Sequence, residues 1–568
     1  MDRAEMIDRI DEFENISFDI FDTLLMRPYV RPTDLFMHME LNEKVPGFAR
    51  EREDAERRAR RKICAEITLD EIYDEVAPAF RELKGLELKY ESNMLTPDPI
   101  MKCVFEHAVS TKKRILLISD MYLPSSFIKD VLDSKGYSGY SDLYVSCEHR
   151  KNKHSGELYH HVLSELGIEK KDLLHIGDNE HSDHKVPENL GIASIHYPRA
   201  ITQYFSENRK AYRFYRRKRN FERSVLVSTD AFKRIADVAE ERENGYWYRF
   251  GYRFGGPITS SFVEFIASNI EKDALLLFIA RDGYNLKKVC DIMHPEIRTE
   301  YIYALRLFNI VFGDGGHDRS EYERYVVEYF SNVPEISAII AEDPEMSHKD
   351  LFGNNEPLFR ELIKEESEKY GKYLNNIVKG SNDVCIADVT TMKFSSQKLI
   401  ERTIGKKVTG FYYTLLSKNQ DLDYKRFNDP KFHNWTNVNL SEFLMSSPEF
   451  PVVGMSSEGK PIYQAENPEC EVHRVSIADE ITRGCEDHAH DIMRIYGEFL
   501  PSISHDSLCR WMESAVRFSS GIDREQIHKI QWASGPDHKR YMSAVMTPQT
   551  LLPYLVNKFK ELVHRLRE

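Results

Sequence analysis

Two carboxylates, Asp19 and Asp22, stand where an apolar run in the segment FDIFDTLL meets a turn. A hydroxyl, Ser119, ends a second apolar run, and an ammonium, Lys153, precedes a predicted helix. A carboxylate can attack phosphorus to give an aspartyl-phosphate. A lysine and a hydroxyl can stabilise the charge that develops on the phosphoryl oxygens. These residue types are therefore parts that the transfer of a phosphoryl group needs.

A further pair of acids, Asp178 and Asp183, lies in the segment IGDNEHSD, which follows another apolar run. Carboxylates, backbone carbonyls and water are the oxygen ligands that Mg²⁺ takes in proteins, and bound Mg²⁺ neutralises phosphoryl oxygens. Ligands of open parallel sheets bind beyond the carboxyl ends of the strands. We therefore expect Asp19, Ser119 and Asp178 to lie at one edge of a sheet, around a metal ion.

The elements that must position these residues alternate between strands and helices. The segment between the first two predicted strands, about residues 27–108, is mainly helical, and Thr68 and Glu71 within it form a predicted capping box. Strands separated by helices predict a parallel sheet that helices cover on both faces. The predicted strands of this sheet lie within residues 15–25, 113–123, 141–148, 171–178 and 192–198.

Taken in order, these segments resemble the four motifs of the haloacid dehalogenase (HAD) superfamily. FDIFDTLL matches D-x-D-x-T, LLISD carries a phosphate-binding serine, KHSGELY carries the lysine, and IGDNEHSD fits G-D-x-x-x-x-D. The resemblance implies a Rossmann-like hydrolase domain over residues 1–205, with a helical cap at about 27–108 and Mg²⁺ as the cofactor. It implies that Asp19 is the nucleophile, that Thr23, Ser119 and Lys153 are the other catalytic groups, and that Asp19, Asp178, Asp183 and the backbone carbonyl of Phe21 hold the metal.

One position departs from the phosphatases of this superfamily, which carry a general acid two residues after the nucleophile. Phe21 occupies that position here, and Asp22 follows it. Dehalogenases of the superfamily also carry an aromatic residue there, but they need no metal, whereas both acids of IGDNEHSD are present. We therefore favour phosphoryl chemistry, with the leaving-group proton coming from Asp22, a cap residue or water. The alternatives are an inactive hydrolase domain in a binding or scaffolding protein, and a metal-independent haloacid dehalogenase.

A narrower resemblance is to a branch that combines FDIFDTLL-x-R and SDMYL with a second α/β region containing ARDGY. Such proteins are found among bacterial surface-polysaccharide genes, which implies a sugar phosphate or a related substrate. The same resemblance places Arg27 beside the site as a possible contact for phosphate or sugar. An arginine at the junction of a strand and a cap is equally often structural.

The second half begins another strand-and-helix pattern, so the whole chain is predicted to be α/β. A basic and aromatic linker is expected at 206–225, and its segment 209–223 is either a solvated connecting helix or a contact with an anionic membrane surface. We expect a second Rossmann-like α/β domain at 226–470 and a mainly helical C-terminal region at 471–568. A possible second site is formed by residues at strand ends, where turns also take such residues readily: Arg281, Asp282 and Asp388.

Composition limits the class of protein. The 568 residues are too many for one core, and the net charge of −14 argues against a general nucleic-acid binder. The first residues are too polar for a signal peptide, and no apolar stretch approaches the roughly 20 residues that span a bilayer. The eight cysteines are scattered without a CxxC pair, as in reduced proteins. We therefore expect a cytoplasmic protein. The partner that the motif resemblance implies is a small phosphorylated substrate.

Overall fold

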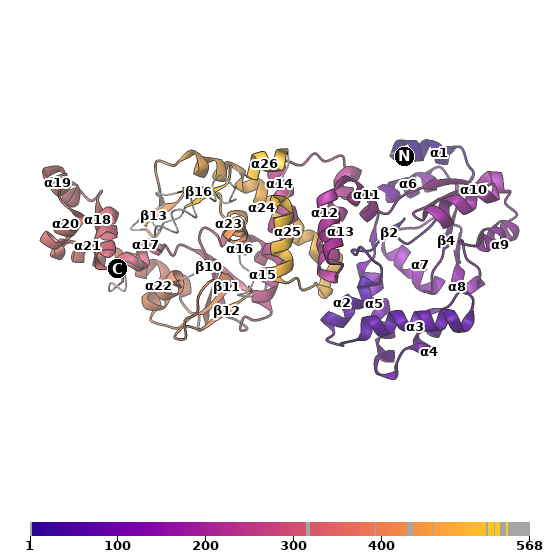
Figure 1. Ribbon diagram of the computed structural model, residues 1–568, viewed down its shortest axis with the longest axis horizontal. Helices are drawn as coiled ribbons and strands as arrows, with labels where there is room; N and C mark the ends of the chain where they lie inside the picture. Colours follow the sequence, from indigo (N-terminus) through magenta and orange to yellow (C-terminus); the bar gives the residue numbers. More distant parts are fainter. Residues whose placement is uncertain are drawn as a thin grey trace. The chain divides into compact units, whose positions relative to one another are not determined.

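The computed structural model describes residues 3–313, 318–391, 393–428, 435–456, 458–517, 521–527, 529–533 and 541–543. The chain forms two compact units (Figure 1). The first comprises Met1–Asn244 and Asp491–Ile503, and the second comprises Gly245–His490 and Ser504–Glu568. Each unit contains a five-stranded sheet in which every strand pairing is parallel. The predicted α/β fold class, with two Rossmann-like sheets, is therefore confirmed.

The sheet of the first unit has the strand order β5-β4-β1-β6-β7. The central strand, β1 (Asn15–Phe18), pairs with β4 (Arg114–Ser119) on one side and with β6 (Leu173–Gly177) on the other. Both neighbours are almost entirely buried, and helices on both faces explain why they are continuous apolar runs in the sequence. The carboxyl ends of all three strands point the same way, because the strands are parallel.

The helical insert after β1 forms a cap with its own polar core. Arg52, on α3 (Phe48–Ile63), is fully buried and donates from Nε and Nη2 to the two carboxylate oxygens of Glu87, both at 2.8 Å. The Tyr73 hydroxyl donates to the same carboxylate at 2.7 Å. The Thr68 and Glu71 capping box at α4 (Leu69–Glu75) is present, as predicted. In Figure 1 the labels α2 to α5 lie together, beside the sheet that carries β4.

The cap ends earlier than residue 108. The two-residue strands β2 (Leu25–Met26) and β3 (Thr96–Pro97) pair at its base. The next helix, α6 (Pro99–Ser110), packs on α1 and β4, and its Phe105 ring lies 5.6 Å from the ring of Phe18. The last part of the predicted cap segment is therefore a helix of the sheet layer.

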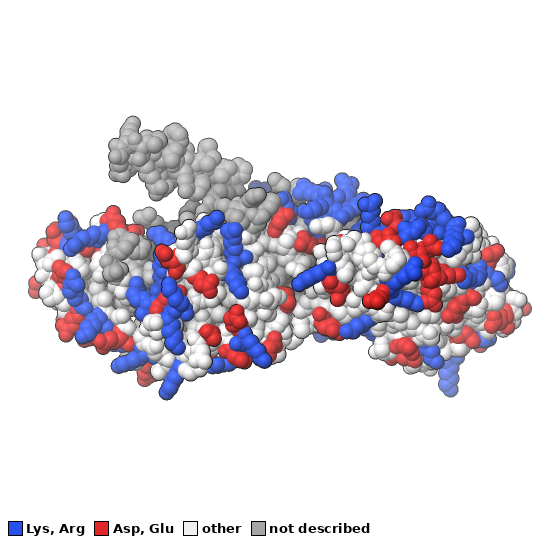
Figure 2. Space-filling view, turned by 90° about the horizontal axis from the view of Figure 1, so that it is seen from below, with Lys and Arg blue, Asp and Glu red and all other residues white. Residues whose placement is uncertain are grey.

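The basic segment predicted as a linker is also part of the first unit. Helix α12 (Arg209–Arg217) buries Ala211, Phe214 and Tyr215, and α13 (Phe221–Ala239) packs on α2, α6, α11 and α12. The apolar face of α12 thus contacts protein, while most of its basic residues are exposed. Figure 2 shows basic and acidic side chains interspersed over the visible face.

The sheet of the second unit has the strand order β12-β11-β10-β8-β9. Its first strand, β8 (Leu275–Ile279), is fully buried between β9 (Arg298–Ile302) and β10 (Val384–Thr391). The chain thus moves to one side of β8 first and to the other side later. In open sheets a ligand crevice lies at such a switch point.

The predicted helical C-terminal region lies only in part within the described residues. Helix α24 (Glu469–Tyr496) and α25 (His505–Arg517) are its long helices, and the antiparallel pair β15 and β16 follows. Residues 544–568, which include the predicted terminal helix, lie outside the described residues. Among the helices that the structure describes, none is both long and apolar enough to cross a membrane.

The remaining elements of the first unit are α1 (Arg3–Asp11), α2 (Asp34–Asn42), η1 (Pro78–Leu83), α5 (Lys84–Met94), α7 (Ser125–Ser134), β5 (Asp142–Val145), α8 (Ser146–His149), α9 (Glu157–Leu166), η2 (Lys170–Asp172), η3 (Glu180–Lys185), α10 (Val186–Leu190), β7 (Ala193–His196), α11 (Ala200–Glu207) and η5 (Gly497–Phe499). Those of the second unit are α14 (Tyr246–Phe250), η4 (Gly251–Gly255), α15 (Gly256–Ala267), α16 (Tyr284–Met293), α17 (Arg306–Val311), α18 (Arg319–Phe330), α19 (Pro334–Glu342), α20 (His348–Asn354), α21 (Glu356–Val378), α22 (Ser395–Ile404), β11 (Thr409–Leu415), β12 (Tyr424–Arg426), α23 (Trp435–Met445), β13 (Val452–Met455), β14 (Pro461–Tyr463), α26 (Ile522–Ile527), β15 (Gln531–Ala533) and β16 (Tyr541–Ser543).

Candidate active site

Three of the residues singled out in the sequence lie at one edge of the first sheet. Asp19 directly follows β1, Ser119 is the last residue of β4, and Asp178 directly follows β6. The backbone N–H of Asp19 donates to the carbonyl of Ile176 at 2.8 Å, so the β1 edge stays paired beyond the strand. Asp19 is 5% exposed and Ser119 1%. The parallel topology thus places a buried carboxylate and a buried hydroxyl at the carboxyl ends of two neighbouring strands.

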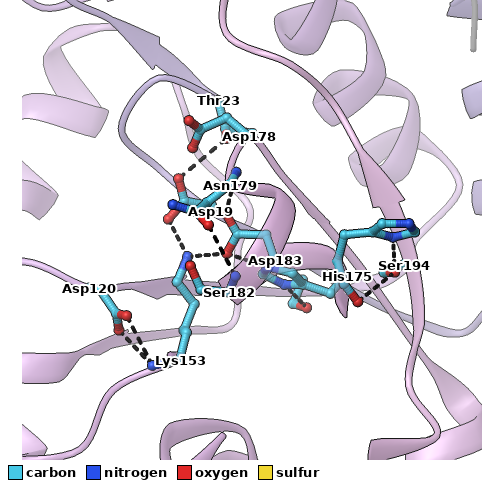
Figure 3. A network of polar contacts seen from close by, with 12 residues as sticks. Asp19, Thr23, Asp120, Lys153, His175, Asp178, Asn179, Ser182, Asp183 and Ser194 are labelled. Carbon is cyan, nitrogen blue, oxygen red and sulfur yellow. Dashed lines mark hydrogen bonds and ion pairs between the residues drawn. The ribbon is translucent and has the colours of Figure 1, made fainter. Parts of the chain in front are cut away.

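Lys153 joins this edge from the loop before α9 (Figure 3). Its Nζ lies 2.5 Å from Asp19 Oδ1 and 2.6 Å from Asp183 Oδ1, and its side chain is 3% exposed. Its backbone N–H donates to both carboxylate oxygens of Asp120, at 2.8 and 3.0 Å. Since Asp120 follows Ser119 directly, the end of β4 fixes the backbone of Lys153, and the two buried carboxylates fix its amine.

Asp183 is held from three sides. Its Oδ1 accepts from Lys153 and lies 3.2 Å from His175 Nε2, and its Oδ2 accepts from the backbone N–H of Asn179 at 3.0 Å. A Cβ on Gly177 would lie 2.5 Å from the carboxyl carbon of Asp183, so this glycine lets the carboxylate close over the strand end. Asp183 therefore orients Lys153 through a direct ion pair.

Burial and like charges shift the acids of this site in opposite directions. Burial raises the pKa of Asp19 to about 7, although Lys153 acts against that shift. Burial, together with the charges of Asp19, Asp22 and Asp183, raises the pKa of Asp178 to about 8. Burial alone would raise the pKa of Asp183 as well, but Lys153 and His175 hold it below its usual range. Negative charge is thus concentrated on Asp183, and Asp19 and Asp178 hold protons easily.

The acids also fit a divalent cation. One carboxylate oxygen each from Asp19, Asp178 and Asp183 lies within 4.8 Å of the other two. Mg²⁺ takes oxygen ligands of this kind and keeps several waters. A cation there would replace the protons that the raised pKa values of Asp19 and Asp178 indicate. The donor set therefore fits Mg²⁺, with Asp183 partly engaged by Lys153 and His175.

The loop after β1 carries the remaining predicted residues. The Thr23 hydroxyl donates to Asp19 Oδ2 at 3.3 Å, whereas Lys153 contacts the other carboxylate oxygen, Oδ1. Asp22 has a left-handed backbone, with φ 61°, and its Oδ1 accepts from Arg199 Nη2 at 3.2 Å. Its charge acts on Asp178, which places Asp22 at the rim of the same site.

Arg27 is committed to contacts inside the protein. Its Nε and Nη2 donate to Glu91 of the cap at 2.8 and 2.5 Å, and its guanidinium stacks on the ring of Phe21 at 4.4 Å. Its side chain is 6% exposed, and Nη1 lies 4.0 Å from Asp22 Oδ2. Arg27 therefore ties the loop that carries Phe21 to cap helix α5.

The site includes residues that sequence reasoning missed. Asp120 follows the predicted Ser119, and the motif alone does not tell that its carboxylate anchors the Lys153 backbone. His175 is a polar residue inside the buried strand β6, and it joins Ser17 Oγ, 2.8 Å from its Nδ1, to Asp183. A fully buried histidine in an apolar run was the available signal.

The predicted second-site residues lie together in the second unit. Arg281, Asp282 and Asp388 all line one cavity at the carboxyl edge of its sheet. They lie in a different unit from Asp19 and its partners.

No protein-family model matches this chain, and no curated protein matches it. Solved structures do match about a third of it. A defluorinating L-2-haloacid dehalogenase is 16% identical, with 34% of this chain and 83% of that one covered and a TM-score of 0.27. The L-2-haloacid dehalogenase of Xanthobacter autotrophicus is 13% identical, with 34% and 83% covered and a TM-score of 0.26.

A HAD family enzyme of Bacteroides thetaiotaomicron, solved as an Asp-to-Ala mutant with magnesium and inorganic phosphate, is 18% identical to this chain. The match covers 33% of this chain and 95% of that one, with a TM-score of 0.23. The structural neighbours of this chain are thus HAD-family enzymes, both dehalogenases and an enzyme that holds magnesium and phosphate.

Proposed function

We propose that the first unit is a Mg²⁺-dependent phosphatase or phosphotransferase that acts through an aspartyl-phosphate on Asp19. The observation that supports this most is the convergence of Asp19, Lys153 and the acid pair Asp178 and Asp183 at one sheet edge. A nucleophilic carboxylate, a buried ammonium and a set of oxygen ligands are the parts that phosphoryl transfer through a covalent intermediate requires.

In this proposal the carboxylate of Asp19 attacks phosphorus and the bond from phosphorus to the leaving oxygen breaks. Lys153 and the Thr23 hydroxyl hold the Asp19 carboxylate from its two oxygens, which fixes the direction of attack. Ser119 and Lys153 lie where they can bind the phosphoryl oxygens, and Lys153 compensates their growing negative charge. Water, or an acceptor hydroxyl, then attacks the aspartyl-phosphate and regenerates Asp19.

Mg²⁺ would be held by Asp19, Asp178 and the backbone carbonyl of Phe21, with Asp183 within reach. The cation would supply positive charge to the phosphoryl oxygens. Asp183 has a second role in the proposal, because its ion pair with Lys153 keeps the amine beside Asp19.

Phe21 occupies the position of the usual general acid and cannot donate a proton to the leaving group. We propose Asp22 as the donor, since it follows Phe21 in the same loop and its side chain is 15% exposed at the rim of the site. A leaving group that needs no proton would remove this requirement. For the substrate we propose a small phosphorylated metabolite, a sugar phosphate in particular, with a role in surface-polysaccharide metabolism.

The test is phosphate release from a panel of sugar phosphates and one aryl phosphate, with Mg²⁺ and with EDTA. Asp19→Asn should abolish release across the panel, and EDTA should suppress it. Asp70→Asn is the matched control, because Asp70 is an exposed aspartate that pairs with Lys84 on the cap surface. Equal rates for the wild type and Asp19→Asn would remove Asp19 as the nucleophile.

A second candidate is a catalytically inactive domain in a binding or scaffolding protein of polysaccharide assembly. The observation in its favour is the contact of the half-buried Phe21 ring with the guanidinium of Arg27, because this stack occupies the position of the missing acid. This candidate predicts no turnover on any phosphate ester, and the metal site could still bind Mg²⁺. Halide release from 2-haloacids without metal would instead indicate the third alternative, a dehalogenase.

A further inference from the structure

The second unit contains a cavity of about 140 Å³ at the carboxyl edge of its sheet. Residues of three neighbouring strands and the turns after them line it: Arg281 and Asp282 after β8, Tyr303 and Arg306 after β9, and Asp388 and Thr390 in the second half of β10. The cavity therefore lies at the switch point of this sheet, where open parallel sheets bind their ligands.

The turn after β8, which lines this cavity, is unusually tight. A Cβ on Gly283 would lie 2.7 Å from the carbonyl oxygen of Ile279, so the turn comes closer to the strand than any other residue type allows. The N–H of Gly283 donates to that same carbonyl at 2.7 Å. Because of this tight turn, Arg281 and Asp282 lie directly beyond the carboxyl end of β8 and line the cavity.

The lining combines three kinds of group. Asp282 and Asp388 are carboxylates, and Glu442 on α23 is near enough for its charge to act on both of them. Arg306 also lines the cavity, and its charge acts on all three acids. Apolar groups complete the wall: Leu305, Leu307, Val452 and Val453.

The positive charge of Arg281 is already used within the protein. Its Nη1 donates to Glu471 Oε2 at 2.8 Å, and Arg474 pairs with the same carboxylate at 2.9 Å. Thr390 also lines the cavity, and its hydroxyl acts against the rise of the pKa of Glu442. The cavity thus offers carboxylate acceptors, a guanidinium donor and a hydroxyl, together with an apolar wall.

Burial and neighbouring acids raise the pKa of Asp388 to about 7 and that of Glu442 to about 8. These shifts reflect carboxyls that crowd together in a buried place, where a phosphate or carboxylate ligand would bring one more negative charge beside them. The cavity is no better suited to a metal ion than to an anionic ligand. Within the described residues, the carboxylates that meet around one point are those of Asp19, Asp178 and Asp183.

We propose that this cavity binds a neutral polyhydroxylated ring, that is, a monosaccharide or one sugar unit of a larger molecule. Hydroxyls donate to the carboxylates of Asp282 and Asp388 and accept from Arg306, while the C–H groups of the ring contact the apolar wall. A cavity of about 150 Å³ holds a six-membered ring such as benzene, which is the size found here. The site goes beyond the chemistry of Asp19, because none of its residues belongs to the first unit.

The test is saturation-transfer NMR on the full chain with neutral hexoses, N-acetylhexosamines and 6-deoxyhexoses, and with inorganic phosphate in a separate arm. At least one sugar should show saturable binding, and Asp388→Asn should weaken it about 10- to 100-fold, the cost of a hydrogen bond to a charged group. Asp19→Asn should leave sugar binding unchanged, which separates this site from the proposed active site. Circular dichroism verifies that each variant is folded.

Arg306→Met provides a second variant, should Asp388→Asn fail to fold. It should weaken sugar binding while leaving phosphate release from the first unit unchanged. The proposal is overturned if no sugar of the panel binds, or if Asp388→Asn and Arg306→Met both bind sugar as the wild type does. Competition by inorganic phosphate at this cavity would equally overturn it, because the site would then be an anion site.

Discussion

Replacing Lys153 by methionine should destabilise the first unit in a pH-dependent way. The amine of Lys153 lies 2.5 Å from Asp19 and 2.6 Å from Asp183, whose side chains are 8% and 1% exposed. Methionine fills similar space and removes the charge, so two desolvated carboxylates lose their shared partner. Breaking a buried ion pair by removing one partner costs about 3–5 kcal/mol.

The sign of the pH effect follows from the two carboxyls. Without Lys153 the folded-state pKa of Asp19 rises further above its unfolded value, and that of Asp183 rises as well, because it loses a partner that holds it low. A buried carboxyl with a raised folded-state pKa contributes stability that is present at low pH and lost as the pH rises through that pKa. Lys153 itself stays charged between pH 5 and 8, because the nearby acids raise its pKa. The loss of unfolding free energy that Lys153→Met causes should therefore be small at pH 5 and complete at pH 8.

Tryptophan emission does not report on this unit, since all four tryptophans, Trp247, Trp435, Trp511 and Trp532, belong to the second unit. Hydrogen exchange of peptides from β1 and β6 reports directly, and 3–5 kcal/mol corresponds to protection lost by about 150- to 4,000-fold at pH 8. Lys185→Met is the control, because Lys185 is exposed and pairs with the exposed Glu180. A deficit that is the same at pH 5 and pH 8 would refute the argument.

Two further predictions concern the metal and the proton. Mg²⁺ should raise the thermal midpoint more at pH 9 than at pH 6, because Asp19 and Asp178, with pKa values of about 7 and 8, must lose their protons to bind it; calorimetry that finds the same shift at both pH values would contradict this. Asp22→Asn should lower turnover of an alkyl phosphate about 10²- to 10⁴-fold and leave an aryl phosphate nearly unchanged, since asparagine tolerates the left-handed backbone at residue 22. An equal loss of turnover on both substrates would instead indicate that Asp22 has a structural role, through its ion pair with Arg199.

The first sheet could be predicted because its strands are buried on both faces and are therefore continuous apolar runs. The capping box at Thr68 and Glu71 is a local pattern, and it too was readable. The roles of Asp120 and His175 were not readable, because they arise from contacts between segments that lie far apart in the sequence. In the charged helix α3, Arg52 shares the helical spacing of the buried Phe48, Ala55 and Ala59, but its partner Glu87 lies 35 residues away and no local pattern reveals it.

The boundary of the first unit also depends on distant contacts. The basic run that begins at Arg209 has the composition of a linker, yet the helical spacing of Ala211, Phe214 and Tyr215 buries one face of it. Residues 491–503 belong to the first unit although they follow the second sheet in the chain. Their Tyr496 carbonyl accepts from Asn93 of the cap, a pairing across 403 residues that no local pattern reveals.

The central claim is that Asp19 and the acids around it form a phosphoryl-transfer site. The most direct measurement is fluorine NMR of the full chain with Mg²⁺ and beryllium fluoride, which mimics a phosphoryl group on a carboxylate. The proposal predicts a bound fluoride signal in the wild type that disappears in Asp19→Asn and on removal of Mg²⁺, and that persists in Asp70→Asn. A wild type without a bound signal, or an Asp19→Asn variant that keeps it, would contradict the claim.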